Sequence, residues 1–131
     1  MSDLPTMHAN NRSSGLLGTH PLRFDEETRT AFAQFEASGA FTNFAGTVQG
    51  GLLGAMLDDV IGLAACAFAG PDRIGPTVQC SIQYMFPVMP GIVRGSARVV
   101  RATSRLLFLE GHLLDAKDRV AVHCTNVTGR R

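Results

Sequence analysis

The order of apolar and polar residues divides the chain into one long apolar segment and a series of alternating segments. Apart from Asp58 and Asp59, residues 50–68 are apolar and poor in β-branched side chains, and Gly70-Pro71 follows them. This combination predicts a buried helix that ends at the glycine, about 28 Å long at 1.5 Å per residue. In residues 77–86, apolar and polar side chains alternate, which predicts a strand with one buried face.

Three more strands are predicted in the second half of the chain, at 92–101, 106–114 and 119–127. The last two are joined by a hairpin turn at 115–118. Short connections between strands imply antiparallel neighbours. A helix that is apolar around most of its circumference must be covered on most sides. The pattern therefore predicts an α+β fold in which a strongly curved antiparallel sheet wraps around one long helix.

The first third of the chain gives a weaker pattern. Residues 1–15 are rich in Asn and Ser and are expected to form a flexible arm, so that a single domain covers 16–131. Residues 25–37 fit two alternatives. Asp25 could cap a helix with acidic residues in its first turn, or a turn could join strands at 22–24 and 29–37. The local pattern leaves both open.

Composition narrows the class of protein. The 131 residues are 45% hydrophobic and 18% charged, with a net charge of +1. These values suit one globular domain and exclude a disordered chain, and no basic block indicates a nucleic-acid partner. Three cysteines without a CxxC pair argue against a metal site and suit reduced thiols. The first residues do not read as a signal peptide, and Asp58 and Asp59 oppose membrane insertion of the apolar helix. We expect a cytoplasmic protein.

Two glycines and a carboxylate on the predicted helix could form a reactive site. The first N–H groups of a helix have no partner within it, and Gly50 and Gly51 carry no side chain to block access to theirs. These groups could stabilise a carbonyl oxygen that gains negative charge. Alternatively, the glycines only permit a tight turn or close packing.

The spacing of these residues has a consequence for assembly. Asp58 lies eight residues after Gly50, roughly 12 Å along a helix. If both act on one small group, the site must contain Gly50 of one chain and Asp58 of the partner subunit, which predicts a symmetric dimer. A partly buried aspartate can attack a carbonyl carbon or activate water. Alternatively, Asp58 or Asp59 holds a neighbouring loop by hydrogen bonds.

Three segments together resemble one known family. The stretch NFAGTVQGG, residues 43–51, followed by Asp58, resembles the N-x-x-G-x-x-H-G-G pattern of PaaI-like hotdog-fold thioesterases, which have an aspartate nine residues after the histidine. Residues 83–87 resemble the N-x-x-Y-x-x-P segment of the family, and residues 101–108 resemble its Arg-rich turn before a Leu-Phe strand. The resemblance covers roughly residues 41–128.

The resemblance implies a hotdog fold with strands at 20–37, a dimer with one continuous sheet and often a homotetramer. It also implies hydrolysis of acyl-CoA to a free acid and CoA without metal or cofactor. In the roles it implies, Asp58 is nucleophile or general base and the Gly50 N–H polarises the thioester carbonyl. Asn43 orients the water or the carboxylate, and Thr77 helps to hold the water.

The chain departs from the family pattern at Gln49, which stands in place of the usual histidine. A glutamine can donate a hydrogen bond to a carbonyl oxygen but cannot transfer a proton near neutral pH. Gly51 is expected beside the substrate, and Arg101 and Arg105 are candidates for binding the phosphates of CoA. Two alternative functions stay open: a hotdog dehydratase or hydratase, and an acyl-CoA-binding protein without turnover.

Overall fold

The long helix is α3, Gly50–Ala69, in the computed structural model, which describes residues 11–131. Gln49 is its N-cap, and the side-chain Oε1 of Gln49 accepts a hydrogen bond from the N–H of Leu52. The helix ends at Gly70, whose φ of 95° is a conformation that glycine adopts without strain. Both ends agree with the sequence-based prediction to within about one residue.

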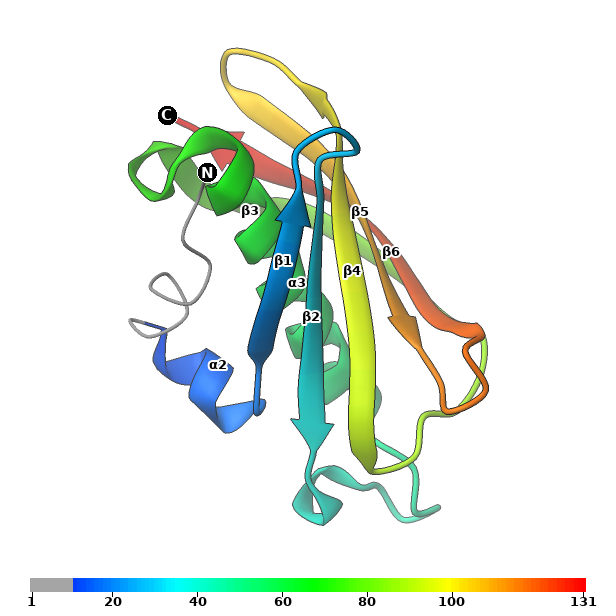
Figure 1. Ribbon diagram of the computed structural model, residues 1–131. Coiled ribbons are helices and arrows are strands. Elements are labelled where there is room, and N and C mark those ends of the chain that lie inside the picture. Colours follow the sequence, from blue (N-terminus) through cyan, green and yellow to red (C-terminus); the bar gives the residue numbers. More distant parts are fainter. Residues whose placement is uncertain (1–10) are drawn as a thin grey trace.

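Six antiparallel strands form one sheet that curves around this helix (Figure 1). Their order across the sheet is β1-β2-β4-β5-β6-β3. The strands are β1 (His20–Asp25), β2 (Thr30–Ala37), β3 (Ile74–Tyr84), β4 (Gly91–Ala102), β5 (Leu106–Leu114) and β6 (Val120–Arg130). The short helical elements are α2 (Arg12–Leu16), η1 (Gly39–Phe41) and η2 (Pro71–Arg73). This is the α+β hotdog architecture expected from the sequence.

Residues 25–37 take the strand alternative. One carboxylate oxygen of Asp25 accepts hydrogen bonds from the N–H groups of Glu27 and Thr28. These bonds close the turn between β1 and β2, so Asp25 caps a turn and not a helix. Arg29 completes the turn with a φ of 58°.

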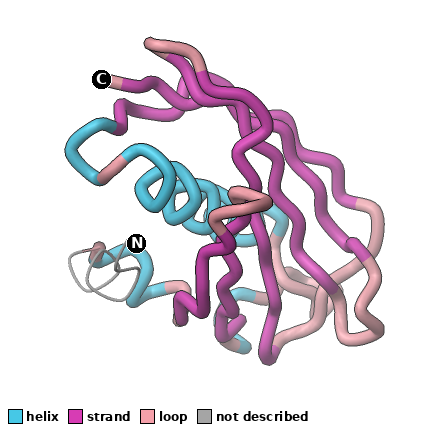
Figure 2. Tube along the Cα trace, turned by 45° about the horizontal axis from the view of Figure 1, so that its top comes forward, coloured by secondary structure: helices cyan, strands magenta, loops and turns pink. Residues whose placement is uncertain are grey.

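Helix α3 lies on the concave side of the sheet (Figure 2). Its sheet-facing side is fully buried, with Met56, Leu57, Val60 and Ile61 at most 1% exposed. Among residues 11–131, α3 is the one helix long and apolar enough to cross a bilayer. It is the core helix of this fold.

The strand expected at 77–86 exists, but its predicted buried face is wrong. Val78 is 64% exposed and Tyr84 is 51% exposed, and Ile82 is half-buried. Cys80, in the same alternating set, is also exposed. The reason is position: β3 is an edge of the sheet and pairs only with β6.

The predicted N-terminal arm overlaps the start of the described structure. Residues 1–10 lie outside the described residues. The remainder of the arm, from residue 12 on, belongs to α2, which lies beside α3 on the side that the sheet leaves uncovered (Figures 1 and 2).

Candidate active site

The carboxylate of Asp58 is exposed and turned toward the edge strand. Asp58 lies in the middle of α3, and its Oδ1 accepts a hydrogen bond of 3.1 Å from the hydroxyl of Thr77 on β3. A single neutral hydrogen bond leaves most of the carboxylate lone pairs free. The structure therefore brings Asp58 and Thr77 together and leaves the rest of the carboxylate exposed.

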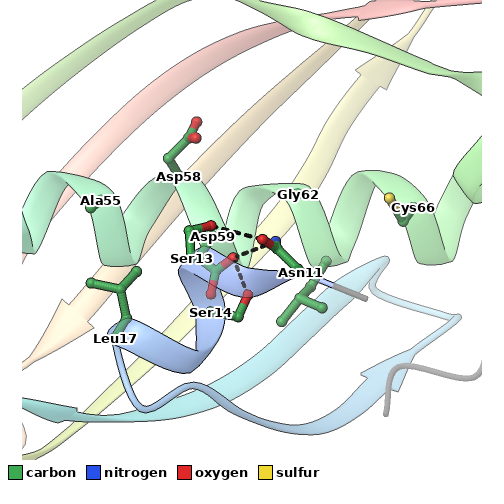
Figure 3. A pocket seen from close by; sticks show the side chains of 10 residues that line it. Asn11, Ser13, Ser14, Leu17, Ala55, Asp58, Asp59, Gly62 and Cys66 are labelled. Atoms are coloured by element: carbon green, nitrogen blue, oxygen red, sulfur yellow. Dashed lines mark hydrogen bonds between the residues drawn. The ribbon is translucent and has the colours of Figure 1, made fainter. Parts of the chain in front are cut away.

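The neighbouring Asp59 has a different environment. Its Oδ2 accepts from the hydroxyl of Thr19 at 2.6 Å, and its Oδ1 accepts from Ser14 at 2.8 Å and from Asn11 at 3.3 Å. Figure 3 shows that Asp59 points toward α2, whereas the Asp58 side chain leaves the helix in a different direction. Asp59 is thus the aspartate that holds a neighbouring segment, whereas the carboxylate of Asp58 is exposed.

The N-terminal tip of α3 presents free backbone donors. Among the described residues, the N–H groups of Gly50 and Gly51 have no hydrogen-bond acceptor. The side-chain oxygen of Gln49 accepts a hydrogen bond from the N–H of Leu52 and not from either glycine. The side-chain amide of Gln49 has no partner in the same part of the chain, so three N–H-bearing groups remain at a helix end that is already partly positive.

Tyr84 is a residue of this tip that the sequence did not single out. Its hydroxyl donates a 2.7 Å hydrogen bond to the carbonyl oxygen of Gly50. Burial and the nearby Cys80 raise the pKa of the Tyr84 phenol, so it stays protonated and donates at neutral pH. A Cβ on residue 50 would lie 3.3 Å from the Tyr84 ring, so glycine also permits this close contact. The N-x-x-Y-x-x-P resemblance was the available signal for Tyr84.

Asn43 organises the loop before α3. Its side-chain oxygen accepts from the N–H groups of Ala45 and Thr47, and its amide nitrogen donates to the hydroxyl of Thr47. These contacts hold residues 43–47 as a closed turn. Within one chain, these contacts engage Asn43 with its own loop and not with Asp58.

Arg101 and Arg105 lie at the β4–β5 end of the sheet. Both are exposed, and among residues 11–131 neither guanidinium has a carboxylate partner. The carbonyl of Arg105 accepts from the N–H of Arg130, and the Arg130 guanidinium lies 5.6 Å from the Phe68 ring near the end of α3. Within one chain, these arginines are therefore at the opposite end of α3 from Gly50.

Two hollows accompany these groups. One, of about 310 Å³, adjoins the helix tip and is lined by Gly50, Tyr84 and apolar side chains of residues 85–88. Another, of about 370 Å³, lies between α2 and α3 with Asp58 at its edge (Figure 3). One chain thus carries a donor-rich hollow and a carboxylate-bearing hollow at separate places on the same helix.

The cysteine thiols offer no alternative nucleophile near α3. Burial raises the pKa of the Cys66 thiol, and burial together with Cys80 raises the pKa of Cys124 to about 12. A thiol is nucleophilic as its thiolate, so these two thiols react only slowly at neutral pH. In the described part of the chain, no cluster of residues could hold a metal ion.

Both the sequence and the structure of this chain are similar to those of known proteins. The family model described as Thioesterase superfamily matches residues 45–122. A phenylacetic acid degradation-related protein of Ralstonia eutropha JMP134 is 26% identical, with a TM-score of 0.89 over 98% of this chain and 99% of that one. A conserved protein of Pseudomonas aeruginosa is also 26% identical, with a TM-score of 0.85 over 95% and 98%.

A more distant structure shares the fold alone. The PaaI protein of the E. coli phenylacetic acid degradation operon is 16% identical, with a TM-score of 0.85 over 97% of this chain and 89% of that one. A search of curated proteins found no match to this sequence.

Proposed function

This chain belongs to the thioesterase superfamily, and from that premise we propose that it hydrolyses acyl-CoA thioesters to a free acid and CoA. The observation that carries the proposal is the division of groups along α3: free N–H donors at Gly50 and Gly51, and an exposed carboxylate at Asp58.

In the proposed reaction, the Asp58 carboxylate acts on the thioester carbonyl carbon. It either removes a proton from an attacking water or attacks directly to form an anhydride that water then cleaves. The C–S bond breaks in both routes, the sulfur leaves as the CoA thiolate, and water supplies the second oxygen of the acid. The Thr77 hydroxyl, 3.1 Å from Oδ1 of Asp58, helps to hold the carboxylate and the water.

The Gly50 N–H stabilises the negative charge that develops on the carbonyl oxygen. Gly51 and the Gln49 side-chain amide are the adjacent donors, and Asn43 keeps the loop that carries them in place. The free amide of Gln49 supports electrostatic help to the carbonyl, although glutamine cannot supply a proton. Tyr84 positions the tip through its bond to the Gly50 carbonyl.

One chain cannot complete this site, because eight residues of helix separate Gly50 from Asp58, roughly 12 Å. We therefore propose a dimer with two sites, each combining the helix tip of one subunit with Asp58 of the partner subunit. The exposed apolar face of the edge strand β3, with Val78 and Tyr84, supports pairing there. A tetramer of two such dimers and a cytoplasmic location belong to the same proposal.

Arg101 and Arg105 are proposed to bind the phosphates of CoA, because their exposed guanidinium groups lack carboxylate partners among the described residues. A dehydratase is less well supported, because the histidine expected for proton transfer is Gln49 here. The side chains of His112 and His123 lie together on the outer face of the sheet, away from α3.

The test is thiol release from a panel of acyl-CoA substrates by the purified protein and by Asp58→Ala. We expect hydrolysis by the wild type and a fall of about 10²–10⁴-fold in kcat for Asp58→Ala, the usual worth of a positioned acid–base group. Saturable acyl-CoA binding without thiol release by the wild type would instead identify a binding protein without turnover.

A further inference from the structure

The hollow between α2 and α3 has an apolar wall and a polar wall whose groups form hydrogen bonds with one another. The apolar wall consists of Leu17, Ala55, Gly62, Leu63 and Cys66. On the polar wall, Asn11 and Ser14 donate to Asp59, and Ser13 donates to Asn11. Because these polar groups bond to one another, the hollow offers a ligand mainly apolar contact.

Gly62 connects Asp58 to this hollow. Asp58, Gly62 and Cys66 are spaced by four residues, so they lie on neighbouring turns of one face of α3. A Cβ built on Gly62 would meet no atom within 4 Å. Figure 3 shows Gly62 between Asp58 and Cys66 along the helix. The missing side chain therefore leaves an open path from the carboxylate into the hollow.

We propose that this hollow binds the acyl group of the thioester, and that Gly62 and Cys66 set the size of the acyl group that the protein accepts. This inference rests on the proposed function, since it assumes a thioester carbonyl at Asp58. The occupant is an apolar acyl group, because the accessible wall is apolar and the carbonyl is already engaged at Asp58.

The volume of the hollow limits the occupant. A cavity of about 150 Å³ is enough for benzene, and this hollow measures about 370 Å³. It therefore has room for an aryl group or for a chain of about eight carbons. Helix α2, held to α3 by Asp59, is the wall that closes the far side.

The first test fills the path with a side chain. In Gly62→Leu and Cys66→Phe, the ratio of kcat/KM for octanoyl-CoA to that for acetyl-CoA should fall at least about tenfold, since pocket contacts of this size are worth one to two orders of magnitude. Gly39→Leu is the matched control, because a Cβ at Gly39 also meets open space but lies outside the hollow. An unchanged ratio in both variants would overturn the inference.

The second test does not depend on turnover. The nonhydrolysable thioether S-octyl-CoA should slow maleimide labelling of Cys66 at least about fivefold, as followed by peptide mass spectrometry, whereas S-methyl-CoA should not. A free model thiol, N-acetylcysteine, labelled in parallel under the same conditions provides the reference for reagent quality. Equal labelling of Cys66 with both thioethers, or no binding of S-octyl-CoA, would overturn the inference.

Together the two tests separate the possible failures. If the wild type hydrolyses no acyl-CoA but S-octyl-CoA protects Cys66, the acyl pocket stands and the proposed hydrolysis fails. If hydrolysis proceeds while both the substrate ratio and the labelling are unaffected, the hydrolysis stands and the acyl pocket is elsewhere.

Discussion

The hydroxyl of Thr19 donates a 2.6 Å hydrogen bond to Oδ2 of Asp59, and this contact ties the start of the domain to the middle of its core helix. Ser14 donates to the other carboxylate oxygen at 2.8 Å. Both hydroxyl-bearing residues are only 2% exposed. The charge of Asp59 is therefore stabilised by donors that have little access to water.

Removal of the Asp59 carboxylate should lower the stability of the fold more than it lowers the rate of hydrolysis. In Asp59→Ala the hydroxyls of Ser14 and Thr19 lose their acceptor while still buried, which we expect to lower the free energy of unfolding by about 1–3 kcal/mol. Urea denaturation at a fixed protein concentration measures this change. Asp58→Ala is the matched control, because its exposed carboxylate holds only Thr77. Asp59→Ala should be the less stable variant, and Asp58→Ala should be the less active one. If one variant were both the less stable and the less active, the account would be contradicted.

Gly62→Ala should stabilise the folded protein. Glycine within a helix costs roughly 0.5–1 kcal/mol relative to alanine, and a Cβ at Gly62 meets no atom within 4 Å. We therefore expect an increase of that size in the free energy of unfolding. Thermal and urea denaturation measure it, with the assembly state checked by gel filtration. A loss of stability would show that another chain or segment packs against Gly62.

A histidine pair on the outer face of the sheet makes stability depend on pH. The rings of His112 and His123 are 5.0 Å apart, across β5 and β6. Burial lowers the pKa of His112, and the positive charges of His123 and Arg98 lower it further, against the opposing effect of Glu110. The unfolded chain, with a histidine pKa near 6.5, therefore takes up this proton more readily than the folded chain.

The sign of the effect follows from this difference. As the pH falls through about 6.5, the unfolded state gains a proton that folded His112 resists, so the free energy of unfolding decreases until the folded pKa is also passed. In His112→Gln this part of the decrease between pH 7.5 and 5.5 should disappear, as measured by urea denaturation. His20→Gln, at an exposed histidine of β1, is the control. If the free energy of unfolding depended on pH equally in His112→Gln and in the wild type, His112 would not be the source of the effect.

Much of the architecture could be predicted from the sequence because its signals are local. The glycines at 50 and 51 and the Gly70-Pro71 stop define α3, and period-two alternation defines β4, β5 and β6. Asp25 needed the resemblance, because an aspartate caps turns and helices through the same side-chain bonds. The family pattern singled out both Thr77 and Asp58, but the hydrogen bond between them was not predicted.

The remaining features depend on long-range geometry that local sequence patterns do not reveal. The apolar face of β3 is exposed because this strand lies at the sheet edge, although its alternation is the same as that of a covered strand. Tyr84 reaches the Gly50 carbonyl across 34 positions of the chain. The different environments of Asp58 and Asp59 likewise depend on where α2 and its flanking residues dock, because the donors to Asp59 lie 40 to 48 residues before it in the sequence.

The central claim is that each site combines the helix tip of one chain with the aspartate of another. Gly50→Pro is expected to remove a donor at the helix tip without disturbing the fold. Proline is favoured at the first helical position. Gln49, with φ −62° and ψ 135°, already has an extended conformation that is compatible with a following proline. The variant removes the N–H of residue 50. Gly50→Ala is its matched control, since it places the same Cβ against Tyr84 but keeps the N–H.

The most direct measurement is hydrolysis by a mixed dimer of one Asp58→Ala chain and one Gly50→Pro chain, isolated through two different affinity tags under conditions in which gel filtration shows dimers and no tetramers. Each variant alone should be nearly inactive. In the mixed dimer, one of the two symmetry-related sites regains both groups, so we expect about half of the wild-type rate per dimer. A mixed dimer no more active than its parent variants would contradict a site shared between chains.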